Sequence, residues 1–416
     1  MDGKLSPLKI LLASDHYPPF VGGAQRQTKV LAHSLVERGH QVVVATVWQD
    51  NLPALEAEGG VDVRRLKQLR SAIPVLRGPA RRRHQPPFPD PVTVRQLRAL
   101  IEECRPDVIH AAGWYTTSVA AAVGRSGIPL LLSARDYGFS CPKVTLLYDD
   151  ALCSGPALGK CLGCAGRHYG APRGWIATLA VLGSRGLLER RMTGLHSVSH
   201  FVDEMMQRDF IRTGAGAAVP REVIPSFRIE DAEDGDVDLL AELPADPFIL
   251  FVGALRPLKG LDVLLRAYEQ LDSPPALVLV GTREPDTPSI PAGVVTLDGL
   301  PHSAVLAAWE RSLFGVMPSR WPEPLGSVVH EAMSRGRAVI GTRPGGHEDM
   351  IEDGESGLLV PSGDVHSLRD AMQRLIDDGE YRDRLGARAA ERADEFTAEQ
   401  VVPKFEALYR QLVDVG

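Results

Sequence analysis

Short apolar runs alternate with helical patterns along the first half of the chain. Each run has the length of a buried strand, and the second is dominated by valine. Residues 24–38 have apolar positions at helical spacing, and Gly39 follows as a stop signal. Strands that alternate with helices form parallel sheets covered on both faces. The strands predicted in this half are 9–13, 41–47, 107–110, 129–133 and 195–199.

A second series of the same kind follows an acidic segment between Pro225 and Pro247, which marks a domain boundary. A helix is predicted over 261–271, and residues 365–415 are helical with breaks near Gly379 and Thr397. The pattern predicts two α/β domains with a cleft between them, in which ligands bind beyond the carboxyl ends of the strands. The strands predicted in this half are 248–255, 276–281, 294–297, 313–317 and 338–341.

Length and charge fit this two-domain picture. The 416 residues suit two domains of ordinary size. No apolar run approaches the ~18 residues of a spanning helix, and no secretory leader is evident, so a cytoplasmic protein is expected. Residues 1–228 hold 29 Lys+Arg against 19 Asp+Glu, a net charge of +10, whereas the remaining 17 and 34 give −17. This asymmetry indicates either two domains with different partners or drift of surface charge.

Residues 322–332 combine two prolines, two glutamates and the start of a helix near Gly326. The free N–H groups and the positive dipole end of such a helix bind anions. Glu331 lies about 7 Å along the helix axis, whereas Glu323 lies before the helix. A diphosphate at the helix start would have one carboxylate toward each of its substituents. Because carboxylates accept paired hydrogen bonds from vicinal hydroxyls, the pattern predicts a nucleotide sugar.

Two further segments lie between a predicted strand and a predicted helix. Residues 253–260 place Arg256 and Lys259 where they would clamp a diphosphate, although the spacing of a phosphate-binding P-loop is absent. Residues 18–23 end in Gly22 and Gly23, which let the backbone approach a ligand closely. The fingerprint G-x-G-x-x-G is missing there, which argues against a nicotinamide-dependent dehydrogenase.

These three motifs, in this order, resemble those of glycosyltransferase family 4, the retaining nucleotide-sugar enzymes with the GT-B fold. The resemblance runs from Lys9 to about Leu375 and is most specific at the two glutamates separated by seven residues. It implies two Rossmann-like domains with parallel sheets facing a central cleft. Residues 1–228 would bind the acceptor and residues 229–397 the nucleotide sugar. Residues 398–416 would form a helix that crosses back to the first domain.

The same resemblance assigns roles to individual residues. Glu331 would hold the nucleotide ribose, and Glu323 would hold the transferred sugar. The family transfers sugar without a catalytic metal, so the positive charge at the diphosphate would come from the protein. Further donor contacts implied by the resemblance are Arg256 and Lys259 at the diphosphate, the backbone of Leu325 and Gly326, and Gly22 with Gly23 closing over the reacting centre.

The chain departs from many relatives at the end of its fourth predicted strand. Those relatives carry His-Asp there, whereas this chain has Arg135 and Asp136. Arginine does not change protonation near neutral pH but donates a fork of hydrogen bonds. Arg135 is therefore expected to contact a sugar oxygen or a phosphate, with an acidic sugar favoured. His110, at the end of another strand, is either an acceptor-side residue or a packed histidine.

Four of the five cysteines, Cys141, Cys153, Cys161 and Cys164, lie close together in the sequence. The closing C-x-x-C is expected to chelate a metal from a tight turn, and four thiolates would complete a structural zinc site in a long irregular connection. An iron–sulfur cluster uses the same ligands, and unliganded thiols are the remaining alternative. Similar cysteines follow the equivalent segment in some similar family members, which favours a structural role.

Two segments bear on the acceptor. Residues 69–91 are rich in arginine and proline and form either a contact for an anionic acceptor or membrane surface, or a solvated loop. Residues 168–188, with Arg173, Trp175 and Arg185, form either an amphipathic helix at an interface or an ordinary helix over the first sheet.

The leading interpretation is a transferase that moves a sugar from a nucleotide diphosphate to a glycan, a lipid or a small molecule. An epimerase or hydrolase with the same donor site would turn over without an acceptor. A non-catalytic scaffold would bind a partner through its cysteine cluster and basic loop. No nucleic-acid motif is present, so no nucleic-acid partner is expected.

Overall fold

A computed structural model describes residues 6–15, 17–19, 23–72, 85–211, 218–228 and 242–415. The chain divides into two compact units. The first comprises Met1–Tyr148, Cys153–Ile224 and Val401–Gly416, and the second comprises Asp149–Leu152 and Pro225–Gln400.

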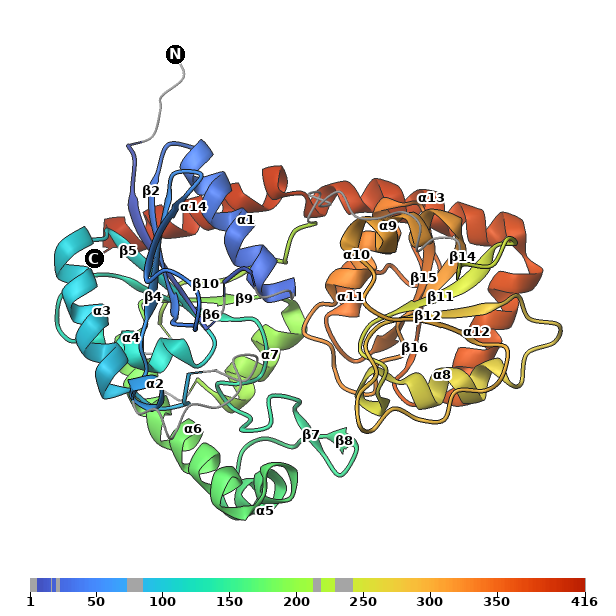
Figure 1. Cartoon of the computed structure of the whole chain (residues 1–416), viewed down its shortest axis with the longest axis horizontal. Helices are drawn as coiled ribbons and strands as arrows, with labels where there is room; N and C mark the ends of the chain where they lie inside the picture. Colours follow the sequence, from blue (N-terminus) through green and yellow to red (C-terminus); the bar gives the residue numbers. More distant parts are fainter. Residues whose placement is uncertain are drawn as a thin grey trace. The chain divides into compact units, whose positions relative to one another are not determined.

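The first unit is built on one twisted sheet, which has eight strands in the described part of the chain (Figure 1). The strand order is β10-β9-β6-β5-β1-β2-β4-β3, and every pair is parallel except β3 with β4. The chain extends the sheet to one side of β1 and then to the other, so the carboxyl ends of β1 and β5 are its switch point. The strands are β1 (Lys9–Ser14), β2 (Gln41–Val47), β3 (Leu55–Glu58), β4 (Val61–Leu66), β5 (Val108–Ala112), β6 (Leu130–Ala134), β9 (Gly194–Ser197) and β10 (Arg221–Val223).

Helix α3 (Pro91–Cys104) of the first unit begins at a side-chain cap. Asp90 accepts hydrogen bonds from the N–H groups of Val92 and Thr93 and so caps α3, whose first residue is Pro91. The short strand β7 (Leu147–Tyr148) follows β6. The helices are α1 (Gly23–Glu37), α2 (Leu69–Ala72), α3 (Pro91–Cys104), α4 (Tyr115–Val123), α5 (Leu158–Tyr169), α6 (Ala171–Arg191) and α7 (His200–Asp209).

The last helix, α14 (Ala398–Val415), packs on the first unit from Val401 onward. Tyr409 Oη lies 2.7 Å from His110 Nδ1, and the Phe405 ring stacks on the His110 ring at 5.5 Å between centroids. Glu406 pairs with Arg38 at 2.7 Å. The amphipathic pattern of the C-terminal segment therefore buries its apolar stripe on the domain that begins the chain.

The second unit contains a parallel sheet of six strands among the described residues, in the order β13-β12-β11-β14-β15-β16. Strand β11 lies between β12 and β14, so the chain leaves the sheet centre in both directions. The carboxyl ends of β11 and β14 are therefore the switch point at which α/β sheets bind ligands. The strands are β11 (Phe248–Val252), β12 (Leu277–Val280), β13 (Val295–Leu297), β14 (Ser312–Val316), β15 (Ala338–Arg343) and β16 (Leu358–Pro361), and the short β8 (Ala151–Leu152) also belongs to this unit.

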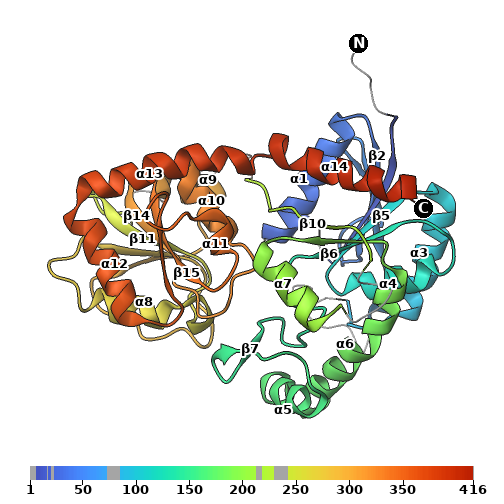
Figure 2. The same cartoon turned by 180° about the vertical axis from the view of Figure 1, so that it is seen from behind.

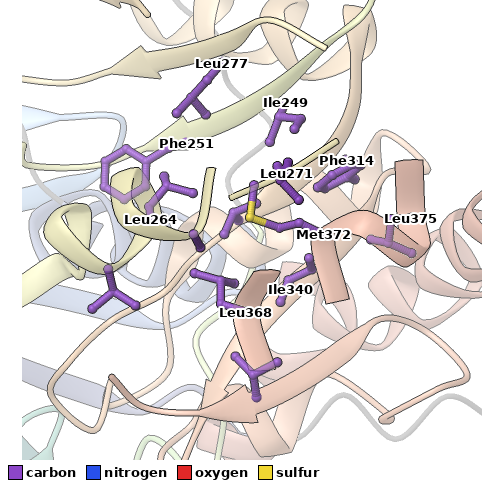
Figure 3. Packing of buried hydrophobic residues seen from close by; sticks show 14 of the residues in the cluster. Ile249, Phe251, Leu264, Leu271, Leu277, Phe314, Ile340, Leu368, Met372 and Leu375 are labelled. Atoms are coloured by element: carbon purple, nitrogen blue, oxygen red, sulfur yellow. The ribbon is translucent and has the colours of Figure 1, made fainter. Parts of the chain in front are cut away.

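Helices bury one face of this second sheet in a continuous apolar core (Figure 3). Side chains of the central strands, such as Ile249, Phe314 and Ile340, meet Leu264 of α8 and Met372 of α12 there. The core fixes the strands whose ends carry the site. The helices of this unit are α8 (Leu261–Tyr268), α9 (His302–Arg311), α10 (Ser327–Ser334), α11 (His347–Met350), α12 (Val365–Asp377) and α13 (Gly379–Ala393), with one-turn 3-10 helices at Pro257–Lys259 and Asp394–Phe396.

The structure confirms the parallel α/β class and corrects several local predictions. The segment that carries Cys161 and Cys164 is helix α5 rather than a tight turn in an irregular connection. The pattern missed β3, β4, β10 and β16 of the two large sheets. In β3 the reason is that it is an exposed edge strand with alternating partial burial and no apolar run. Most of the arginine-rich segment 69–91 and most of the acidic boundary segment lie outside the described residues.

Candidate functional site

The candidate site lies at the carboxyl ends of β11 and β14. The loop after β11 contains Arg256 and the one-turn helix Pro257–Lys259, and the loop after β14 leads through Glu323 to α10. These loops meet because β11 and β14 are neighbours in the sheet. Two of the predicted motifs, 60 or more residues apart in the sequence, are thus brought to one place by the strand order.

A glycine allows the two loops to touch. Gly260 has φ +75°, and a Cβ atom on it would lie 1.8 Å from the carbonyl oxygen of Pro318. The Arg320 N–H also donates to the carbonyl of Leu258 at 3.1 Å. This backbone contact places Lys259 beside the loop that carries Glu323.

Glu323 is the centre of the resulting cluster. Its side chain is buried, and its Oε1 accepts hydrogen bonds from Lys259 Nζ at 2.5 Å, Ser319 Oγ at 2.6 Å and Trp321 Nε1 at 2.8 Å. Lys259 Nζ also lies 5.4 Å from the centroid of the Trp321 ring. The three donors converge on one oxygen and fix the carboxylate in a single orientation.

The electrostatics keep Glu323 ionised. Burial alone would raise the pKa of its carboxyl group, but the charge of Lys259 and the hydrogen bonds from Lys259 and Ser319 outweigh burial and lower that pKa. A carboxylate with a lowered pKa accepts hydrogen bonds at neutral pH and does not act as a proton donor. The chemistry open to Glu323 is therefore the binding of hydroxyl groups and the stabilisation of developing positive charge.

The loop that carries Glu323 rests on the glycine pair after β15. The Gly346 N–H donates to the Glu323 carbonyl at 2.7 Å. A Cβ atom on Gly346 would lie 2.1 Å from the carbonyl oxygen of Pro324 and 2.6 Å from Leu325 Cα. Only glycine allows this approach, so the pair supports the extended segment before α10.

His347 fills the space beneath the start of α10. Its Nδ1 accepts a hydrogen bond from the Thr342 N–H at 3.1 Å, which requires that nitrogen to be unprotonated. Burial lowers the pKa of His347 to about 4, although the carboxylate of Glu323 opposes this shift. The buried, neutral imidazole of His347 therefore has a structural role beneath the site.

Acidification should destabilise the second unit through His347. Below pH 6.5 the unfolded chain binds a proton at this residue, whereas the folded chain binds it only near pH 4. The unfolding free energy should therefore fall by up to about 3 kcal/mol between these pH values. Denaturant titrations across this range would measure the fall, and His347→Asn should reduce it, since an amide oxygen replaces Nδ1. His330 of the same unit, whose pKa burial lowers to about 3, accounts for the part that remains. An equal pH dependence in the variant would contradict the assignment.

Helix α10 begins at Ser327, directly after Gly326, as the sequence pattern predicts. Leu325 is buried before it. Glu331 lies in the second turn, where its Oε1 is 3.0 Å from His302 Nε2 of α9. The helix start thus separates the two glutamates, with Glu323 before it and Glu331 within it.

Arg256 lies in the loop after β11, with its guanidinium 3.4 Å from the carboxylate of Asp286. Both side chains are at least one-third exposed. Among the predicted donor residues of this unit, Lys259 and Glu323 are in direct contact, whereas Arg256 and Glu331 pair with Asp286 and His302.

In the first unit, Arg135 and Asp136 follow β6. Arg135 donates to Thr28 Oγ1 at 3.4 Å, and burial lowers its pKa to about 10. Burial raises the pKa of Asp136, whose Oδ1 accepts from the Gly138 N–H at 2.8 Å. Arg135 and His110 line a small cavity of about 20 Å³ at the carboxyl ends of β1, β5 and β6. His110 is buried and hydrogen-bonded to Tyr409, as the packed alternative requires.

Asp15, directly after β1, was not singled out from the sequence. Its carboxylate accepts hydrogen bonds from the N–H groups of Gln85 and Trp114 at 3.2 and 3.1 Å. Burial raises its pKa to about 7, and the charge of Asp136 adds to this shift. The switch point of the first sheet therefore gathers two carboxyl groups and one arginine. Of the predicted glycine pair nearby, Gly23 is the first residue of α1, and Gly22 lies outside the described residues.

The four clustered cysteines line one cavity of about 20 Å³ in the first unit. Burial raises the pKa of the Cys141 and Cys161 thiols, and all five cysteines are free. Within the described ranges, no group of three or more His, Cys, Asp or Glu residues is placed so as to hold a metal ion. The zinc site stays a prediction, which metal analysis of the purified protein would decide.

Sequence reasoning missed several residues that complete the donor-side cluster. Ser319 and Trp321 lie just before the motif of Glu323, so extending that motif by four residues would have found them. His347 directly follows the glycine pair Gly345-Gly346, which is the sequence signal that could have found it. His302 carries no signal of its own, because only the packing of α9 on α10 brings it to Glu331.

Comparison with known proteins adds two family models. Residues 22–226 match the model described as a glycosyl transferase 4-like domain, and residues 240–392 match the model described as glycosyl transferases group 1. Together these models cover most of the chain and follow the division into two units.

Two curated relatives are named D-inositol 3-phosphate glycosyltransferase. The chain is 26% identical to the Nocardioides sp. protein over 332 residues, which is 73% of this chain and 67% of the relative. It is 31% identical to the Corynebacterium glutamicum protein over 182 residues, which is 40% of this chain and 43% of the relative. The match to the second relative thus spans less than half of that protein.

Solved structures share the fold over nearly the full length. Sucrose-phosphate synthase from Thermosynechococcus elongatus superposes with a TM-score of 0.72 at 22% identity, covering 98% of this chain and all of that one. The Anabaena protein HepE in complex with UDP and glucose superposes with a TM-score of 0.68 at 17% identity, covering 97% of this chain and all of that one. These likenesses establish the GT-B fold.

Proposed function

This chain is a glycosyltransferase of family 4 with the GT-B fold, and we propose that it moves a sugar from a nucleotide diphosphate to an acceptor with retention of configuration. The observation that carries the proposal is the contact of Lys259 with Glu323 beside the start of α10. An ammonium group, a fixed carboxylate and a helix start would then surround one ligand.

The proposed donor lies with its diphosphate at the start of α10. The free N–H groups of this helix would bind phosphate oxygens, and Lys259 and Arg256 would neutralise the charge that develops as the diphosphate leaves. The transfer as proposed needs no metal ion, because these groups supply the positive charge. The Anabaena protein HepE, solved in complex with UDP and glucose, supports a nucleotide-sugar donor.

The proposed role of Glu323 is to hold the sugar. The described hydrogen bonds of its carboxylate end on Oε1, so Oε2 would accept from a sugar hydroxyl. Because the pKa of Glu323 is lowered, it would stabilise positive charge near the anomeric carbon rather than protonate the leaving group. An acceptor that attacks from the face of the departing diphosphate gives retention without a protein nucleophile.

The acceptor would bind at the switch point of the first sheet, near Arg135 and Asp136. The net positive charge of residues 1–228 favours an acceptor that is anionic or lies at a membrane surface. We place the reaction in the cytoplasm. In the described part of the chain no helix is both long and apolar enough to cross a bilayer.

Binding of nucleoside diphosphates tests the donor site. One of UDP, GDP, ADP, CDP and dTDP should raise the thermal midpoint by a few degrees at saturation. Glu331→Ala should weaken binding of that nucleotide roughly 10- to 100-fold, because a charge-assisted hydrogen bond from the ribose is lost. Glu355→Gln, on the exposed surface of the same unit, is the matched control.

The same assay separates the alternatives. Product analysis with the matching nucleotide sugar should show acceptor-dependent release of the diphosphate. Equal turnover without any acceptor would favour a hydrolase or an epimerase, and absence of nucleotide binding in the wild-type protein would contradict the donor site.

A further inference from the structure

Helix α6 exposes an apolar face where a helix on a soluble domain carries polar residues. Trp175, Ile176 and Leu179 are 51%, 58% and 58% exposed. Their spacing places them on one side of the helix. The opposite side already packs on the unit through Gly174, Thr178, Val181, Arg185 and Leu188, so the exposed face is not needed for the core.

Helix α5 extends this exposed face. It lies beside α6 in both views (Figures 1 and 2), and the two helices are joined at Gly170. Leu158 at its first residue is 53% exposed, and Tyr169 at its last residue is 36% exposed. We call the surface formed by Leu158, Trp175, Ile176 and Leu179 the α5–α6 face; the Tyr169 hydroxyl instead donates to the carbonyl of Pro142 at 3.1 Å. Large exposed apolar side chains on neighbouring helices mark a surface that meets a partner.

The charges around the face indicate which partner. Residues 151–188 contain no aspartate or glutamate, but they contain Lys160, Arg167, Arg173 and Arg185. Arg185 is buried, and its Nε donates to the carbonyl of Phe210, so its role is structural. Arg173 is exposed in the first turn of α6, two residues before Trp175, whereas the exposed Arg167 lies over the Tyr148 ring at 5.6 Å. An exposed arginine beside an apolar face, in a segment without acidic side chains, complements anionic lipid headgroups over hydrocarbon. A second copy would bring the same positive charges together, which opposes self-association.

We propose that the α5–α6 face docks on the surface of an anionic lipid bilayer. Trp175, Ile176 and Leu179 would enter the boundary between headgroups and acyl chains, where tryptophan is favoured. Arg173 would pair with lipid phosphate. The helix lies in the plane of the membrane and does not cross it. This docking goes beyond sugar transfer, and it uses a surface of the first unit, whereas the proposed donor site belongs to the second.

Vesicle co-sedimentation of the full chain tests the proposal. Vesicles of equal parts phosphatidylcholine and phosphatidylglycerol should bind the wild-type protein, whereas pure phosphatidylcholine should bind it weakly. The triple variant Trp175→Ser, Ile176→Ser, Leu179→Ser should lower the partition coefficient roughly tenfold or more. Arg173→Glu should lower it several-fold, with the difference shrinking at high salt.

Leu55→Ser is the matched control, because Leu55 is 58% exposed on β3, outside the α5–α6 face. Its vesicle binding should equal that of the wild type. All variants should keep the wild-type thermal midpoint and its nucleotide-dependent shift, which would show that the fold and the other unit are intact.

Three results would overturn the proposal. The wild-type protein would fail to bind anionic vesicles at low salt, or the triple variant would bind them as the wild type does. Alternatively, light scattering would show a wild-type dimer that the triple variant converts to a monomer, which would make the face a contact between two copies of the chain.

Discussion

Glu323→Gln should lower kcat/KM for sugar release from the matching nucleotide sugar by roughly 100-fold, while affinity for the free nucleoside diphosphate changes little. The substitution preserves the size of the side chain but removes the charge that Lys259 neutralises at 2.5 Å. A hydrogen bond to a charged acceptor contributes about 1.5–3 kcal/mol, which is the size of this loss. Steady-state assays of diphosphate release and titrations with the free nucleotide would measure the two effects.

Glu331→Ala is the complementary variant, since it should lower the affinity for the free nucleoside diphosphate. A loss of nucleotide affinity in Glu323→Gln equal to the loss in turnover would mean that Glu323 serves the diphosphate end of the donor. Unchanged turnover would remove Glu323 from the reaction. The wild-type thermal midpoint should be retained within a few degrees, because the amide still accepts from Ser319 and Trp321.

Gly346→Ala should disable the donor site without touching a ligand. The added Cβ atom would lie 2.1 Å from the carbonyl oxygen of Pro324, and neither atom belongs to a flexible side chain. The segment from Pro322 to Gly326 must therefore move. Overpacking of this kind costs roughly 1–3 kcal/mol of stability, and a shift of about 1 Å in a catalytic group lowers the rate about 100-fold. Denaturant unfolding and diphosphate release would report both effects.

The matched control for this variant is Gly163→Ala in α5. No atom lies within 4 Å of the Cβ position there, and helix propensity favours alanine over glycine by about 1 kcal/mol. This variant should be neutral or slightly more stable. A fully active Gly346→Ala protein would show that the loop before α10 tolerates displacement, and that its position does not control donor binding.

The sequence by itself determined five of the six strands that the described part of the second sheet contains, and the start of helix α10. The predicted strand 313–317 and helix start near Gly326 lie within one residue of β14 and α10, because buried parallel strands are continuous apolar runs and proline and glycine fix local backbone geometry. The sequence also separated the two α/β series, since each must bury its own core. Edge strands such as β3 were missed because they are exposed and have no apolar run. Pairing with the neighbouring strand defines them instead.

The tertiary structure alone decided which of the candidate side chains meet. The pairing of β11 with β14 and the close contact at Gly260 bring Lys259 to Glu323, and the packing of α9 on α10 brings His302 to Glu331. His110 could have faced a ligand or the core, and the return of α14 to the first sheet gave it Tyr409 as a partner. Contacts between distant segments depend on strand order and helix packing, which local residue patterns do not contain.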